Sequence, residues 1–156
     1  MQKSVNLYPA IGVPGQEVAA KSAVYTPQNF ISDGTAAAGS FVFAAEAEGK
    51  GVAFPVASAK GEGDCLGLCE RVFSGVLAFD ENGTMVYPKG HALTIATRGD
   101  YYVSATGVAQ VGQAVLCDPA TGEVTYGNAG DQNDTGWKVV TEAKGADDII
   151  IISNRG

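Results

Sequence analysis

The sequence has a single histidine, so almost no position in the chain can offer an imidazole base to a nucleophile. That residue, His91, follows Pro88-Lys89-Gly90, a run typical of a turn before a strand. A catalytic triad through His91 also needs a nucleophile and an orienting carboxylate. The chain contains no Gly-x-Ser-x-Gly elbow, no phosphate-binding loop and no dinucleotide fingerprint opening a helix. We therefore predict that the protein has no catalytic residues and is not an enzyme.

Cysteine is also scarce, with three residues, Cys65, Cys69 and Cys117. An odd number, in a chain whose start shows no signal-peptide pattern, favours free and mostly buried thiols over disulfides. A zinc site made from the three thiols and His91 is the alternative, but Cys65-x3-Cys69 has no matching second pair. We expect no zinc and no other cofactor.

Acidic residues gather in two loops, at residues 80–82 and 131–134, and calcium is the alternative to consider for both. Neither loop has the twelve-residue spacing and terminal glutamate of an EF-hand. Asp, Asn and Gly also dominate plain turns. We interpret both loops as turns without a metal.

Positive charge and long hydrophobic runs are lacking as well. The chain has 10 basic and 17 acidic residues, so its formal charge is 10 − 17 = −7. An anionic protein gains little from a phosphate backbone or an anionic membrane surface. The longest apolar run, residues 149–152, is far shorter than the roughly 20 residues of a membrane-spanning helix. We expect no nucleic-acid partner, no membrane partner and synthesis in a bacterial cytoplasm.

Helix signals are few, because the alanine-rich stretches at residues 36–38 and 44–47 are each cut short by glycine. The 21 glycines are spread along the chain, with short runs rich in Val, Ile, Tyr, Phe and Thr between them. Asn82-Gly83 between two such runs is typical of a hairpin turn. The pattern predicts an all-β fold, a single-domain β-sandwich or barrel that is jelly-roll-like. The expected strands cover residues 74–79, 84–87, 92–97, 101–105, 114–117, 123–126, 137–141 and 148–153.

The first sixteen residues differ from the rest, because Pro9, Pro14 and the glycines near them favour an extended, irregular backbone. We predict an extended N-terminal arm over residues 1–16 and a β-sandwich domain over residues 17–156. Two arrangements are open to such an arm: it packs on its own domain, or it reaches across to a neighbouring molecule.

Aromatic residues offer a few candidates for contact. Tyr101 and Tyr102 are adjacent in an expected strand, so their rings point to opposite faces of the sheet. One ring is expected in the core, and the other is then a candidate contact residue. Trp137 is expected in the core, with an interface position as the alternative.

The order of several short segments resembles the bacteriophage structural cement proteins, the capsid decoration proteins of some podovirus-like heads. The segments that carry the resemblance are Asn6-Leu7-Tyr8-Pro9-Ala10-Ile11-Gly12-Val13-Pro14-Gly15-Gln16, Gly67-Leu68-Cys69-Glu70-Arg71, Tyr87-Pro88-Lys89-Gly90 through Gly99-Asp100-Tyr101-Tyr102-Val103, Val111-Gly112-Gln113-Ala114-Val115, Thr121-Gly122-Glu123-Val124, Gly136-Trp137-Lys138-Val139 and residues 149–153.

The resemblance implies a structural protein of the virion, docked on the outer capsid surface where it stabilises contacts between subunits of the major capsid protein. It also implies a homodimer or homotrimer without catalytic or cofactor-binding residues. We expect the contacts with the capsid or a neighbouring subunit to be made by Tyr8, Pro9, Ile11, Pro14, Tyr101 and Tyr102.

Two other classes of function stay open. A phage tail protein, or a receptor- or carbohydrate-binding β module, normally exposes several aromatics on one face, whereas the aromatics here are scattered through the expected strands. A small β-barrel enzyme, such as a nucleotide hydrolase, needs Asp, Ser and basic residues clustered around a phosphate, and the sequence has no such cluster.

Overall fold

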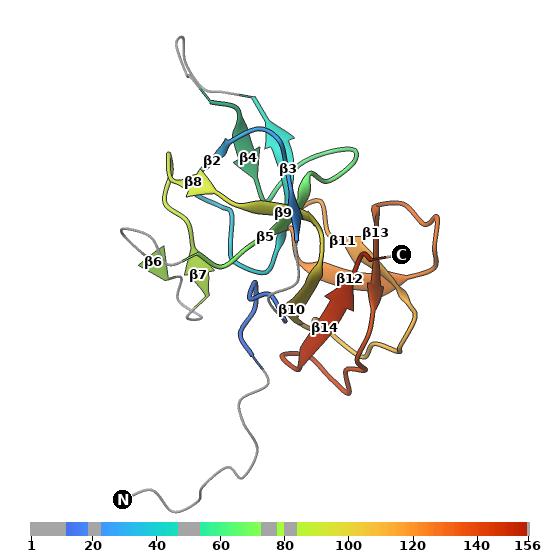
Figure 1. Cartoon of the computed structure of the whole chain (residues 1–156). Helices are drawn as coiled ribbons and strands as arrows, with labels where there is room; N and C mark the ends of the chain where they lie inside the picture. Colours follow the sequence, from blue (N-terminus) through green and yellow to red (C-terminus); the bar gives the residue numbers. More distant parts are fainter. Residues whose placement is uncertain (1–11, 19–22, 47–53, 73–77, 80–83, 156) are drawn as a thin grey trace, which may run out of the picture.

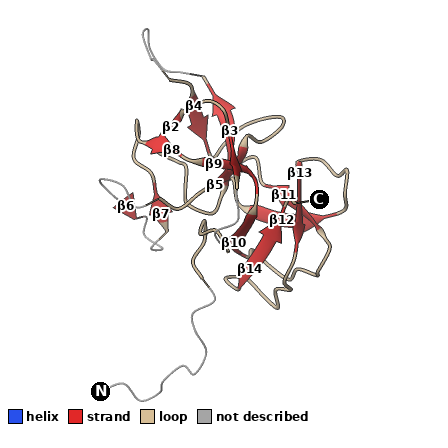
Figure 2. Cartoon of the chain, in the orientation of Figure 1, coloured by secondary structure: helices blue, strands red, loops and turns tan. Residues whose placement is uncertain are grey.

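The computed structural model (Figures 1 and 2) describes residues 12–18, 23–46, 54–72, 78–79 and 84–155 of the 156-residue chain. These residues form strands, isolated bridges and turns, with no helix among them. The all-β prediction is therefore confirmed. Within the same ranges, no helix is long and apolar enough to cross a membrane.

Two β-sheets make up most of the described chain. The larger has the strand order β1 (Val24–Tyr25), β9 (Ile95–Arg98), β5 (Gly67–Cys69), β3 (Phe41–Ala45), β4 (Val56–Ser58), β2 (Phe30–Ser32), β8 (Ala92–Leu93). The smaller has the order β10 (Asp100–Ser104), β14 (Ile149–Ser153), β13 (Asp134–Val139), β11 (Ala114–Cys117), β12 (Val124–Gly127). A separate pair consists of β6 (Ala78–Phe79) and β7 (Met85–Val86). The β2–β4 pair is parallel and the other strand pairs in these sheets are antiparallel.

Alternation of side chains along the larger sheet explains how its two faces are both covered. In β3, Phe41 and Phe43 face the smaller sheet, and the Phe41 ring meets Trp137 edge-on with centroids 6.1 Å apart. Val42, between them, faces the other way and packs in a second cluster with Tyr87. Successive side chains of a strand point to opposite faces, so one strand supplies both clusters. The first cluster lies between the two sheets and makes the molecule a sandwich.

The passage from one sheet to the other occurs at Gly99, between the end of β9 and the start of β10. Its φ of +148° and its close approach to Tyr101 both favour glycine, because a Cβ there would lie 2.7 Å from the Tyr101 ring. Strands before Gly99 form the larger sheet and the β6–β7 pair, and strands after it form the smaller sheet. A jelly roll instead interleaves strands from both halves of the chain, so that part of the prediction is not confirmed.

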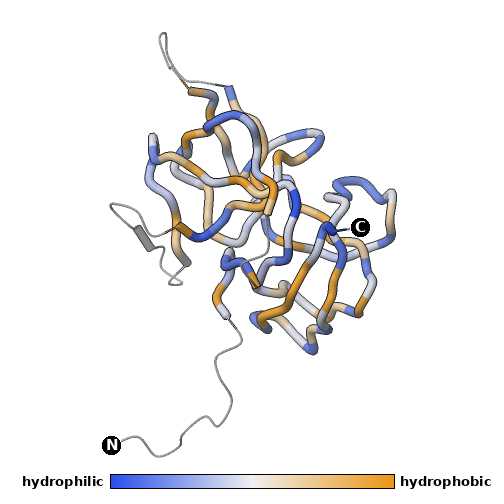
Figure 3. Tube along the Cα trace, viewed as in Figure 1, coloured by the Kyte–Doolittle hydropathy of each residue, from blue (hydrophilic) through white to orange (hydrophobic). Residues whose placement is uncertain are grey.

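Most strands expected in the second half of the chain are present, with small shifts in their bounds. The run at residues 92–97 is divided into β8 and β9. The predicted hairpin pairing is confirmed, because Ala78 pairs with Val86 and Phe79 with Met85, while its turn at residues 80–83 lies outside the described residues. Trp137 is buried, as expected. Figure 3 shows the isoleucine run of β14 as a strongly hydrophobic stretch of the trace.

Candidate functional site

Residues 12–18, which we call the strap, run along the outer edge of β10; they are the blue segment beside that strand in Figure 1. Three backbone hydrogen bonds and one bridge attach the strap: Gly15 N to Tyr102 O (2.8 Å), Tyr102 N to Gln16 O (3.0 Å), Val18 N to Asp100 O (2.9 Å), and the Glu17–Tyr101 bridge. An uncovered edge strand presents unpaired N–H and C=O groups that invite another chain. The strap therefore occupies this edge of the smaller sheet.

The strap is also fixed to the larger sheet. The Arg71 backbone N donates to Gly15 O over 2.8 Å, and Arg71 Nε donates to Pro14 O over 2.9 Å. Gly15 has a φ of +83°, and a Cβ there would lie 2.7 Å from Gly39 N. A side chain at position 15 is thus excluded both by backbone conformation and by space. The contacts of residues 12–16 with their own domain correspond to the first of the two arrangements that the sequence left open for the arm.

Tyr102 is half-buried, and its ring lies against the strap. A Cβ on Gly12 would lie 2.5 Å from Tyr102 Cδ2, so the ring occupies the space that a side chain there would need. Pro14, in the same strap, is also half-buried. The structure therefore brings two of the predicted contact residues to one edge of the molecule. Tyr8, Pro9 and Ile11 lie outside the described residues.

Tyr101 points the opposite way from Tyr102, as predicted, and has no exposed surface. Its ring meets Trp137 edge-on at 6.0 Å, and its hydroxyl donates to Glu70 Oε2 over 3.0 Å. Burial and the nearby Glu70 carboxylate raise the pKa of this phenol well above its ordinary value. Tyr101 therefore supports the strap-bearing edge from beneath, and Tyr102 is the member of the pair that reaches the surface.

An open cleft of about 420 Å³, which we call the arginine cleft, lies at the corner where β9 passes into β10. Val24, Arg98, Gly99 and Arg155 line it. Arg98 Nε lies 3.4 Å from the carbonyl oxygen of Asn154, to which it donates. The strap and the arginine cleft therefore meet at the start of β10.

Charges behind the cleft are organised around Asp100. Arg155 Nε is 2.9 Å from Asp100 Oδ2, and the Ser153 hydroxyl donates to Asp100 Oδ1 over 2.5 Å. Arg155 Nη2 is 4.0 Å from Oε1 of Glu17 in the strap. That buried oxygen accepts no hydrogen bond from the described residues, and the Arg155 guanidinium supplies it with a compensating charge. The positive charge of Arg155 is therefore largely balanced from within the chain.

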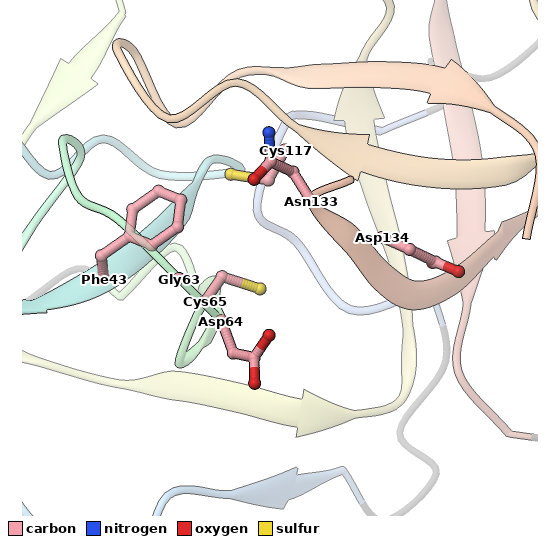
Figure 4. Close-up of a pocket in the computed structure, with 7 residues that line it drawn as sticks. All are labelled: Phe43, Gly63, Asp64, Cys65, Cys117, Asn133 and Asp134. Atoms are coloured by element: carbon pink, nitrogen blue, oxygen red, sulfur yellow. The ribbon is translucent and has the colours of Figure 1, made fainter. Parts of the chain in front are cut away.

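A second, much smaller cleft lies at the junction of the sheets (Figure 4). Figure 4 shows Cys65 and Cys117 entering it from opposite sides, and its volume of about 10 Å³ leaves space for roughly one water molecule. Burial raises the pKa of Cys65 to about 11 and that of Cys117 to about 12. Cys69 lies in the outer cluster with Tyr87. Cys65 and Cys117 thus meet at one small cleft, whereas Cys69 lies in the other cluster, and all three are free thiols.

The remaining candidates for chemistry have structural roles. His91 stacks on Tyr87 with ring centroids 5.3 Å apart, and its Nδ1 lies 2.8 Å from Ala92 O. In the loop at residues 131–134, Asp134 accepts hydrogen bonds from the Gly130 and Gly136 backbones, which lower the pKa of its carboxyl. This carboxylate organises its own turn. Across the described ranges, no group of three or more His, Cys, Asp or Glu side chains is placed to hold a metal ion.

Sequence reasoning missed the arginine cleft, because Arg98 and Arg155 are distant in the chain and meet only through the corner at Gly99. The one indication in the sequence was the small number of arginines. The chain has three, and two of them line this cleft. The contacts of Gly39 and Arg71 with the strap were also missed, although Arg71 ends one of the segments that carry the family resemblance.

The fold and the site define an all-β sandwich in which an N-terminal strap closes one sheet edge beside a surface cleft. The family of phage structural cement proteins (E217 gp24/Pam3 gp6) matches residues 1–154, so the chain belongs to this family. The resemblance found in the sequence is confirmed, and the family places the protein among structural components of the phage capsid. No curated protein matches the chain.

Proposed function

We propose that this protein binds the outer surface of a tailed-phage capsid and stabilises the contacts between subunits of the major capsid protein. The observation that carries the proposal is the family match over residues 1–154, which spans the predicted arm as well as the sandwich. The protein acts as a homodimer or homotrimer, as expected for a clamp near a symmetry axis.

The strap supports this function mechanically. It is hydrogen-bonded to β10 of the smaller sheet and to Arg71 beside the larger one, so it is anchored to both halves of the sandwich. A force applied to the chain before Gly12 would therefore be transmitted through the strap to the core of the sandwich. The proposed contacts are Tyr8, Pro9 and Ile11 in the arm, followed by Pro14 and Tyr102 at the strap.

Stabilisation follows from mass action. A protein that binds the assembled lattice but not separate subunits stabilises the lattice by RT ln(1 + [L]/Kd) at each site. At a free concentration of 100 Kd this amounts to about 2.7 kcal/mol per site. Repetition over many sites of a capsid makes moderate affinity at each one sufficient.

The test uses capsids assembled without this protein. Purified protein is added, and its co-sedimentation with capsids and the temperature of genome release are measured. We expect saturable binding to assembled capsids, little binding to dissociated capsid subunits, and a higher release temperature. Absence of binding to capsids, or equal affinity for dissociated subunits, would overturn the proposal.

A further inference from the structure

We propose that the arginine cleft receives a carboxylate side chain of the major capsid protein, with Arg98 as its main contact. This inference rests on the proposed function and adds to it a named docking position and the chemistry of its ligand. The cleft is separate from the residues that the sequence predicted to make contact.

The charge distribution singles this position out. The chain has a net charge of −7 and three arginines, yet Arg98 and Arg155 line the same cleft. A guanidinium presents a planar fork of donors that matches the two oxygens of a carboxylate. In an acidic protein, such a position is where a negatively charged partner residue meets the least repulsion.

Arg98 and Arg155 differ in how far nearby carboxylates within the chain already balance their positive charge. Arg155 is paired with Asp100 and approaches Glu17. Arg98 is exposed, its Nε faces a backbone carbonyl, and it forms no salt bridge with any described residue. Its terminal nitrogens are therefore the donors on which an incoming carboxylate would be held, and Arg155 also lines the cleft.

The surroundings of the cleft have the composition of a binding position. Val24 lines it and is 50% exposed. It belongs to β1, at the edge of the larger sheet. Arginine is enriched among the residues that dominate binding energy, and apolar neighbours exclude water around a charged pair. An acidic side chain flanked by apolar residues is the ligand that fits this arrangement.

The cleft is continuous with the edge that carries the strap. Val18 N donates to Asp100 O, and Gly99 of the cleft is the residue that precedes Asp100. A partner in contact with Pro14 and Tyr102 in the middle of β10 would therefore meet Arg98 just beyond the start of that strand. This continuity favours the capsid protein as the source of the carboxylate over a second copy of this chain, which itself carries a charge of −7.

The first experiment compares charge reversals in the full chain, with capsids assembled without the protein as the probe. Arg98→Glu is expected to weaken co-sedimentation about tenfold or more, and Arg98→Gln to have a smaller effect in the same direction. Lys144→Glu, an equal charge change at an exposed residue before β14, is expected to bind like the wild type. Equal thermal unfolding midpoints would show that the variants are folded.

Wild-type affinity retained by both Arg98 variants would overturn this inference and leave the proposed function intact. A wild-type protein that fails to bind capsids would overturn the proposed function instead. Equal losses for Arg98→Glu and Lys144→Glu would also contradict the inference, because they would show a general charge effect.

The second experiment identifies the source of the carboxylate. Arg98→Lys places an amine in the cleft that a water-soluble carbodiimide couples to a touching carboxylate, forming an amide with loss of one water molecule. Mass spectrometry of capsid-bound protein is expected to find position 98 joined to an Asp or Glu of the major capsid protein. A cross-link from position 98 to a second copy of this chain, or none beyond that of the wild type, would overturn the assignment.

Discussion

The backbones of Gly15 and Gly39 approach so closely that a Cβ on Gly15 would lie 2.7 Å from Gly39 N. Both residues have a φ of +83°, and a Cβ on Gly39 would lie 2.7 Å from the Pro14 Cβ. Gly39 N donates to Cys69 O in β5, while Gly15 N donates to Tyr102 O in β10. The contact between the two glycines therefore joins the strap to both sheets of the sandwich.

This contact predicts different costs for the same substitution at two glycines. Gly15→Ala should lower the free energy of unfolding by about 2–4 kcal/mol, because strain at positive φ and a steric clash add together. Gly112→Ala is the matched control, since its φ is +86° and no atom lies within 4 Å of an added Cβ. It should cost about 1 kcal/mol. Urea unfolding measures both values, and similar losses would show that the strap is not tightly held.

The hydroxyl groups of two tyrosines give a second matched pair. Tyr101→Phe should lower the free energy of unfolding by about 1–3 kcal/mol, because the Tyr101 hydroxyl donates to the Glu70 carboxylate. The Tyr126 hydroxyl is buried near the Thr106 N–H but forms no hydrogen bond of good geometry with the described residues. Tyr126→Phe should therefore be nearly neutral or stabilising. Chemical denaturation tests the order, and a larger loss at Tyr126 would contradict it.

The strands in the second half of the chain were predicted well from the sequence, because they have one buried and one more exposed face. In β10, Tyr101 and Val103 are buried while Tyr102 and Ser104 are less so, and this alternation is visible in the sequence. The first half was harder. Phe41, Val42 and Phe43 in β3 are all buried, so no polar residue marks the period of the strand.

The candidate site was predictable in part, for a similar reason. The prolines and glycines near Pro14 indicated an extended arm. The adjacency of Tyr101 and Tyr102 in an expected strand indicated that their rings point to opposite faces of the sheet. The strap's attachment depends on Gly39 and Arg71, which are far away in the chain. Such pairing is decided by the tertiary fold, which short motifs do not encode.

Alkaline pH should reveal the burial of Cys69. Burial raises the pKa of this thiol from 9.0 to about 12. Between these values the unfolded chain has lost a proton that the folded protein keeps, so the free energy of unfolding falls as pH rises, by at most about 1.4 kcal/mol per pH unit for one proton. Cys69→Ala should show a shallower fall between pH 9 and pH 11 in urea titrations. An unchanged slope would indicate that the thiol ionises normally in the folded protein.

Removal of residues 1–11 tests the arm separately from the strap. The truncated protein keeps the hydrogen bonds that join residues 12–18 to Tyr102, Asp100 and Arg71, so it should still unfold in one cooperative transition. Its binding to capsids should weaken at least about tenfold, because Tyr8, Pro9 and Ile11 are lost as proposed contacts. Removal of residues 1–18 should reduce stability as well. Undiminished capsid binding after the shorter deletion would refute a contact role for the arm.

The most direct test of the central claim is the copy number of this protein in purified virions, measured by quantitative mass spectrometry against the major capsid protein. A cement protein that covers the lattice should be present at a ratio near one to one, or at a simple fraction of it. A few copies per particle would assign the protein to a tail or portal, and its absence from virions would contradict the account.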